Sequence, residues 1–237
     1  MRLSLNEAHA LARDAARGAG VSWGEAGEIA DAMIAREVIR SGFGSPASSA
    51  HADKGFTAAA ELVQRPEQIS LLLAARDQAT LLWLQRDRGA LPPSMHLAHP
   101  VDGCWLFLLL AEAINQTGPS QPAENNLSLT AQSADEAPAA SAPLIIFPPT
   151  GTPILSAQLR DRFVTDQAAP EVAVLTLAQY DHATDAIVFD QPALRRAAVE
   201  TGLPIARPAL KLLKRLAGRT LVPASERSRR RGAGAEG

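Results

Sequence analysis

The chain has little cysteine, few aromatic residues and no long hydrophobic run. Cys104 is the single cysteine among 237 residues, so no intrachain disulfide can form. The longest apolar run, Trp105 to Ala111, is far shorter than the roughly 20 residues of a membrane-spanning helix. The chain also reaches Glu7 with no apolar signal core before it. We therefore expect a cytoplasmic protein with no membrane association.

The scarcity of aromatic residues limits what the core contains. Aromatic residues make up 4% of the chain, while hydrophobic residues as a whole reach 46%, an ordinary value for a globular protein. The core must therefore be built mainly from Leu, Ala, Val and Ile. Abundant alanine favours helices, because alanine loses no side-chain entropy there. The length allows a substantial core, and we predict a single domain over residues 1–237.

Two capping boxes indicate two helices at the start of the chain. Ser4 pairs with Glu7 and Ser22 with Glu25, each glutamate three residues after its serine. Apolar residues recur at spacings of three and four in both segments: Leu5, Ala8, Leu11, Ala12, Ala15 and Ala19, then Ala26, Ile29, Ala30, Met33 and Ile34. The sequence predicts a helical hairpin over residues 3–42.

Glycines are expected to end both helices of this hairpin. Gly20 follows the first helix and Gly42 the second, and glycine readily adopts the left-handed conformation that ends a helix. A flexible stretch is expected from Ser41 to Pro46.

The middle of the chain contains apolar segments whose type the pattern leaves open. A helix is expected from Thr57 to Val63. The segment from Gln68 to Arg86 is either strand or helix, and its end, Thr80 to Leu84, favours a strand. Cys104 to Asn115 is again either a buried strand or a short helix. Residues 118–143 are rich in Pro, Ser and Ala and predict a linker or surface loop.

The second half mixes strands with helices. We predict strands at Leu127 to Thr130, Leu144 to Phe147 and Val172 to Leu177. One helix is expected to follow Asp190 and to end at Gly202, and another to begin at Pro208, with an apolar stripe of Ala209, Leu212, Leu213 and Leu216. The predicted fold is α/β or α+β, with the N-terminal hairpin packed with a mixed sheet and a helical C-terminus.

Three residues in the middle have the chemistry of a metal site or a nucleophile. His96, His99 and Cys104 are ligand types for zinc, but a structural zinc site needs four ligands and no second pair follows. We predict two loop histidines and no metal. A catalytic Cys104 would need a base such as His182, whereas a lone cysteine beside an apolar run is typical of a buried core.

Two further polar motifs are better explained as turns. The motif at residues 148–153, Pro-Pro-Thr-Gly-Thr-Pro, lacks the lysine of a phosphate-binding loop. Tyr180, Asp181, His182 and Asp185 supply acid and base groups, but consecutive residues seldom converge on one site. We expect a polar turn there.

Positive charge is concentrated at the C-terminal end. The formal net charge is only −2, yet residues 206–231 contain nine Lys or Arg and one acidic residue, Glu226. Fourteen basic and twenty-four acidic residues remain in the rest of the chain. This asymmetry favours an anionic partner for the basic end or docking of that end on the acidic body, while a solvated basic helix with a frayed end is the alternative.

The basic tail at residues 219–237 is our candidate binding site. Arginine binds carboxylate or phosphate in bidentate fashion, and glycine allows backbone amides to approach the same anion. The proposed anion-binding residues are Ser225, Arg227, Arg229, Arg230, Arg231, Gly232 and Gly234. Nucleic acid is a weaker candidate, because the whole chain is acidic and no aromatic residue interrupts the arginines.

Both ends of the chain resemble one uncharacterised bacterial family, domain of unknown function thirty-seven twenty-six. At the start the similarity lies in Leu3-Ser4-Leu5, the turn at residues 16–20 and Trp23-Gly24. At the end it lies in Thr220, residues 222–226, Ser228-Arg229 and Gly232-Ala233-Gly234. Two features depart from the family pattern. Leu221 stands where members more often have an aromatic residue, and the chain stops at Glu236-Gly237, where members usually continue into a short acidic ending. The resemblance implies no known activity, substrate or cofactor.

The opening hairpin is also similar, more faintly, to that of the malate/L-lactate dehydrogenase type-2 family. In that family a loop with Asp and Ser-His-Gly follows the helix pair, whereas residues 39–45 here contain no histidine. The dehydrogenase interpretation therefore lacks its catalytic residue.

Two functional hypotheses follow from the sequence. The first is a protein that binds a small anionic ligand or an acidic partner surface through its C-terminal end. The alternative is an enzyme that acts on an anionic metabolite, with catalytic residues that the sequence does not identify. An incomplete set of acid, base and nucleophile residues favours the first hypothesis.

Overall fold

A computed structural model describes ten segments of the chain. They are residues 1–43, 54–85, 94–117, 127–132, 143–147, 154–156, 161–163, 171–179, 186–188 and 191–220. The helices are α1 (Leu5–Gly18), α2 (Trp23–Phe43), α4 (Thr57–Leu62), α5 (Pro66–Gln85), α6 (Gly103–Thr117), α8 (Gln191–Thr201), α9 (Arg207–Ala217) and the 3-10 turn η3 (Gly218–Thr220). The strands are β1 (Arg2–Leu3), β2 (Ser94–Asp102), β3 (Leu127–Gln132), β4 (Pro143–Phe147), β5 (Ile154–Ser156), β6 (Glu171–Gln179), β7 (Ala186–Val188) and β8 (Leu203–Pro204).

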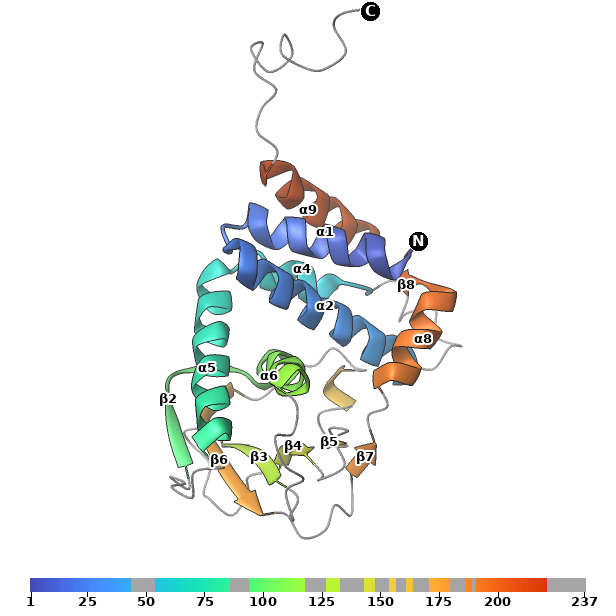
Figure 1. Ribbon diagram of the computed structural model, residues 1–237. Helices are drawn as coiled ribbons and strands as arrows, with labels where there is room; N and C mark the ends of the chain where they lie inside the picture. Colours follow the sequence, from blue (N-terminus) through green and yellow to red (C-terminus); the bar gives the residue numbers. More distant parts are fainter. Residues whose placement is uncertain are drawn as a thin grey trace, which may run out of the picture.

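The helices form a layered body above a sheet (Figure 1). Helices α1 and α9 lie at the top, α2 and α4 lie beneath them, and the large sheet lies at the bottom. Helix α6 packs between α2 and the sheet, and α5 packs along α6 and β2. The α+β class is therefore confirmed, but the hairpin reaches the large sheet through α6.

The large sheet is antiparallel, although we expected a mixed sheet. Its six strands follow the order β2-β6-β3-β4-β5-β7, and all described pairs are antiparallel. Strands β3, β4 and β6 confirm the three strands that the sequence predicts. Strand β3 lies within residues 118–143, where we expected a linker or loop, and the rest of that stretch up to residue 142 lies outside the described residues.

The N-terminal hairpin forms as predicted, with one difference at its end. The Ser4 hydroxyl accepts a hydrogen bond from the Glu7 amide at 3.3 Å, and a Glu7 carboxylate oxygen accepts from the Ser4 amide at 2.9 Å. Gly20 has a φ of 102° and ends the turn after α1. Gly42, in contrast, lies inside α2, which continues to Phe43, so the expected stop at Gly42 is wrong.

The two ambiguous apolar segments are both helices. Pro66 opens α5, where its missing amide costs no hydrogen bond, and the helix continues through the Thr80 region that we expected to be a strand. Helix α6 begins after Asp102, whose carboxylate accepts a hydrogen bond from the Trp105 amide at 3.0 Å. Both helices bury many of their residues, so apolar side chains are not confined to one face. The local sequence pattern therefore could not distinguish helix from strand.

The two ends of the described chain lie side by side. Strand β1 pairs with β8, and the Ile205 amide donates to the Met1 carbonyl at 2.9 Å. Helix α1 packs against α9, with Ala209, Leu213 and Leu216 of α9 buried and Leu212 partly buried, which confirms the predicted stripe. Where the two helices end, Gly18 lies directly against the carbonyl of Leu216.

We predict that Gly18→Ala destabilises the fold. An added Cβ would overlap the Leu216 carbonyl oxygen, so α9 would have to shift, at a cost of about 1–3 kcal/mol in the free energy of unfolding. Gly27→Ala is the matched control, because no atom lies within 4 Å of its added Cβ; inside α2 it should stabilise by about 0.5–1 kcal/mol. Chemical denaturation measures both. Equal effects of the two substitutions would contradict the close contact at Gly18.

Candidate functional site

All seven residues of the predicted anion site lie outside the described residues. The structure describes the chain up to Thr220, so Ser225, Gly232, Gly234 and the arginines between residues 227 and 231 stay a prediction. The motif at residues 148–153 and the polar turn at residues 180–185 also lie outside the described segments.

Helix α9 presents a row of basic side chains to solvent at the base of this tail. Arg207, Lys211, Lys214 and Arg215 are exposed on the side of α9 opposite its buried residues, and the exposed Arg219 follows in η3. No acidic residue occurs between residues 201 and 225. None of these five side chains forms an ion pair within the described part of the chain.

Stabilisation of the helix explains only part of the charge pattern of α9. Lys214 and Arg215 in the last turn interact favourably with the negative end of the helix dipole. Arg207 in the first turn has the opposite effect, because it lies at the positive end. The dipole therefore accounts for only part of the row.

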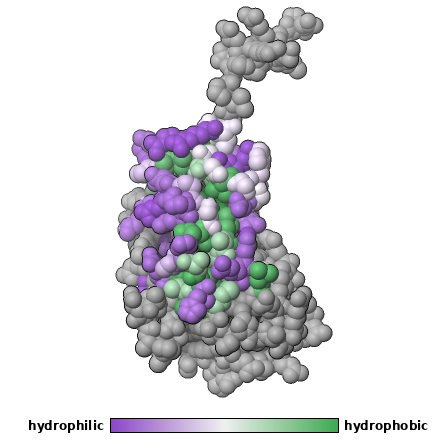
Figure 2. Space-filling model, turned by 90° about the vertical axis from the view of Figure 1, so that its left-hand side faces the viewer, coloured by the Kyte–Doolittle hydropathy of each residue, from purple (hydrophilic) through white to green (hydrophobic). Residues whose placement is uncertain are grey.

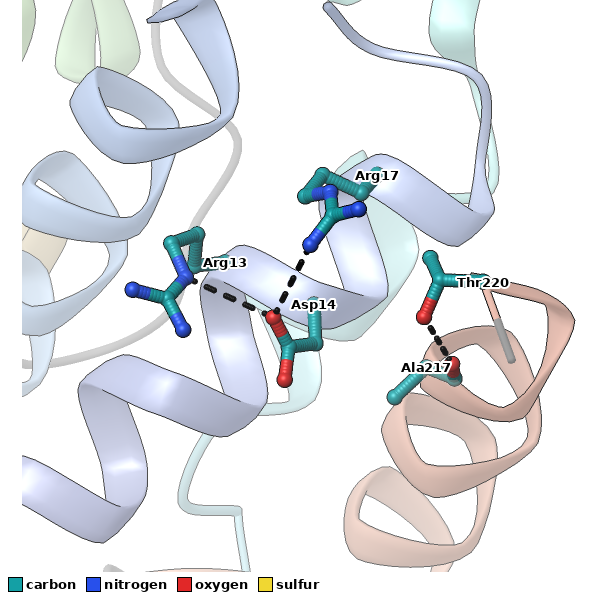
Figure 3. A network of polar contacts seen from close by, with 5 residues as sticks. All are labelled: Arg13, Asp14, Arg17, Ala217 and Thr220. Carbon is teal, nitrogen blue, oxygen red and sulfur yellow. Dashed lines mark hydrogen bonds and ion pairs between the residues drawn. The ribbon is translucent and has the colours of Figure 1, made fainter. Parts of the chain in front are cut away.

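The end of α1 adds two arginines near the end of α9 (Figure 3). Asp14 lies between Arg13 and Arg17, at 3.4 and 3.8 Å, so one carboxylate faces two guanidinium groups. The Arg17 guanidinium also lies 3.0 Å from the centre of the Trp23 ring, and Trp23 is 71% exposed. Figure 2 shows hydrophilic residues at the top and left of the coloured face, and apolar residues that run down its middle.

A second feature, a pocket, lies lower in the molecule, and sequence reasoning missed it. It has a volume of about 410 Å³ and opens between α4, α5 and the junction of β2 with α6. Its buried lining includes Arg36 of α2 and Trp105 of α6, whereas Glu61, Arg65 and Glu171 are exposed at its rim. Residues from six elements (α2, α4, α5, β2, α6 and β6) meet here, and no local motif could have shown that.

Arg36 belongs to a group of charged side chains buried in α2. Every residue from 32 to 40 is buried, including Arg36, Glu37 and Arg40. Two nitrogens of Arg40 contact one carboxylate oxygen of Glu37, at 2.8 and 2.9 Å. Burial raises the pKa of Glu37, while the charges of Arg40 and Arg36 oppose that rise. The ion pair thus offsets part of the desolvation cost of burying the Glu37 carboxylate.

Glu37 also holds the chain where α4 begins. Its carboxylate accepts a hydrogen bond from the backbone amide of Phe56. Phe56 has a φ of 62°, a left-handed conformation that costs energy for a residue with a side chain, and it is 1% exposed. The buried carboxylate therefore fixes the start of α4, one wall of the pocket, to α2.

Cys104 is a core residue and not a reactive thiol. It is 1% exposed at the start of α6, as expected from its apolar surroundings. Burial raises the pKa of its thiol to about 12, and the charge of Asp102 adds to the rise, while Arg36 opposes it. Only the thiolate is a strong nucleophile, so Cys104 stays unreactive near neutral pH.

The three candidate zinc ligands do not share one environment. His96 and His99 are exposed on β2, so our expectation that they lie in a loop is wrong. Cys104 is buried at the start of α6. Within the described segments, no group of three or more His, Cys, Asp or Glu side chains is placed to hold a metal ion.

One family model matches the start of the chain. The model, described as "Protein of unknown function (DUF3726)", covers residues 3–40, which span α1 and most of α2. The N-terminal resemblance is confirmed. The similarity at the C-terminal end lies outside the matched segment and stays a prediction. Neither the curated proteins nor the solved structures contain a match to the chain.

Among the described residues, no helix combines the length and the apolar character that crossing a membrane would require.

We predict that Cys104 resists alkylation in the folded protein. Iodoacetamide at mildly alkaline pH should leave the thiol unmodified, because the thiol is both buried and protonated. The same reagent should modify it fully in denaturant, which serves as the control. Intact mass spectrometry measures the extent. Rapid modification of the folded chain would contradict the buried position.

We predict a large effect from breaking the ion pair on α2. Arg40→Leu leaves the Glu37 carboxylate buried without its main partner and should cost about 3–5 kcal/mol in the free energy of unfolding. The double variant Glu37→Leu with Arg40→Leu removes both charges and should be more stable than Arg40→Leu alone. Urea denaturation compares them. A double variant as unstable as the single one would show that the charges are not coupled.

Proposed function

We propose that this protein binds an acidic protein surface through its basic C-terminal end. The observation that carries the proposal is the exposed row of Arg207, Lys211, Lys214, Arg215 and Arg219, with no acidic residue among them. The row is spread along one face of a helix and not gathered around a cavity, which suits an extended partner better than a small anion.

The proposed surface extends in two directions. Along the chain it leads into the arginines of residues 227–231, which continue the same charge. Across the surface it leads towards Arg17 and the exposed Trp23, and arginine and tryptophan are enriched among the residues that dominate binding energy at protein interfaces. Complementary charge would steer the partner and set its orientation.

A cytoplasmic location is part of the proposal. The cytoplasm is a reducing compartment in which disulfides are rare. A chain with a single cysteine, which forms no intrachain disulfide, is consistent with that compartment.

Charge removal on α9 tests the proposal. We expect the double variant Lys211→Gln with Lys214→Gln to weaken binding of a fluorescent polyglutamate peptide by about twofold to thirtyfold, because each exposed ion pair contributes roughly 0.2–1 kcal/mol. Anisotropy titration measures the affinity, and higher salt should weaken binding by the full chain. Removing the arginines at residues 227–231 should weaken it further.

The matched control removes the same charge elsewhere. Lys54→Gln with Arg196→Gln changes two exposed basic residues outside α9 and should leave the affinity unchanged. Equal losses of affinity in both double variants would show that only the net charge of the chain matters. That result would contradict a specific binding surface on α9. Much tighter binding of polyuridylate RNA than of the peptide would replace the protein partner by nucleic acid.

Catalysis on an anionic metabolite is the second hypothesis. Cys104 is not a suitable nucleophile for it, because its thiol stays protonated. Turnover of a metabolite by the purified chain would favour the enzyme, and saturable binding without turnover would favour the binding protein.

A further inference from the structure

Groups of opposite charge line the pocket near Cys104. The guanidinium of Arg36 lies 5.1 Å from the centre of the Trp105 ring, and Arg36 is only 5% exposed. Asp102 is bound to the Trp105 amide at 3.0 Å. Cys104 lies between Asp102 and Trp105 in the sequence. Its sulfur accepts a hydrogen bond from Arg36, and the negative charge of Asp102 raises the pKa of its thiol. A positive and a negative group therefore border the same part of the pocket.

The remaining lining of the pocket is apolar inside and polar outside. Leu62, Leu72, Val101 and Trp105 are buried in its walls. The volume of about 410 Å³ lies in the range of sites that enclose small organic molecules. A ligand there would place an apolar body against these walls.

The charges of the lining select the kind of polar group. The lining includes Arg36 and Arg65 together with Glu61, Asp102 and Glu171, and the register of β2 with β6 puts Asp102 opposite Glu171. A ligand with only negative charge would be repelled by the carboxylates, and one with only positive charge would be repelled by Arg36. A ligand with both charges close together satisfies both sides.

We propose that the pocket binds an amino-acid-like zwitterion with an apolar side chain. Its carboxylate pairs with Arg36, its ammonium pairs with Asp102, and its side chain packs on Leu62, Leu72 and Trp105. The proposal does not depend on the basic C-terminal end, which lies on other residues.

Three matched ligands test the pairing of charges. L-Leucine should bind the full chain in a calorimetric titration, whereas 4-methylpentanoate, which lacks the amine, and isopentylamine, which lacks the carboxylate, should each bind at least about tenfold more weakly. Equal affinity for leucine and 4-methylpentanoate would reduce the site to a simple anion site and overturn the proposal. So would a lack of binding by L-leucine, L-methionine and L-phenylalanine alike.

Asp102→Asn tests the role of the carboxylate without removing the helix cap. Asparagine caps a helix as well as aspartate does, so α6 should persist, which circular dichroism checks. The variant should lower the affinity for leucine, and it should not lower that for 4-methylpentanoate, because it removes one of the carboxylates that repel this anion. Glu200→Gln, which removes an exposed carboxylate on α8, is the matched control and should change neither affinity. Unchanged leucine binding by Asp102→Asn would overturn the proposal.

Arg36→Gln tests the opposite partner. It should weaken binding of leucine and of 4-methylpentanoate together, while isopentylamine, which Arg36 repels, should bind at least as tightly as before. Because Arg36 is buried, a loss of folding is a separate outcome, and the decision then rests on Asp102→Asn, which changes a partly exposed group.

Discussion

The buried ion pair between Glu37 and Arg40 is the constraint on which the helical body depends. Helix α2 contacts α1, α6 and α8, and its residues 32–40 are all buried, so a charged side chain there cannot reach water. A buried carboxylate is tolerated only where a cation and hydrogen-bond donors surround it. Glu37 obtains them from Arg40 and from the backbone of Phe56. These partners hold the start of α4 in one position against α2, and α4 forms one wall of the pocket.

Small side chains allow the helices around α2 to approach closely. Helix α1 buries Ala8, Ala12, Ala15 and Ala16, and Gly18 meets the backbone of α9 directly. Such contacts need little aromatic bulk, which agrees with the low aromatic content of the chain. The larger side chains Trp105 and Phe107 lie in α6, where helices and sheet meet. These two aromatic residues therefore serve the junction of the two layers.

Charged groups divide into a surface set and an interior set, and each suits a different kind of partner. Exposed charges along α9 are screened by salt and contribute little singly, so they favour an extended partner that contacts many of them at once. Arg36, in contrast, is desolvated before any ligand arrives, so a single well-placed group can interact with it strongly. The proposed acidic protein on α9 and the proposed zwitterion in the pocket would therefore use separate residues and would not compete for them.

The sequence alone determined the features that rest on neighbouring residues. The capping box of Ser4 and Glu7, the hairpin, the apolar stripe of α9 and the basic character of the C-terminal end depend on spacings of a few residues, and the structure confirms the first three. Tertiary structure decided that α5 is a helix, that α2 continues through Gly42, and that the large sheet is antiparallel. The pocket also arises only in the tertiary structure, because its lining residues Arg36, Asp102 and Glu171 are distant in sequence. Burial and strand pairing depend on such distant contacts, and no local pattern encodes them.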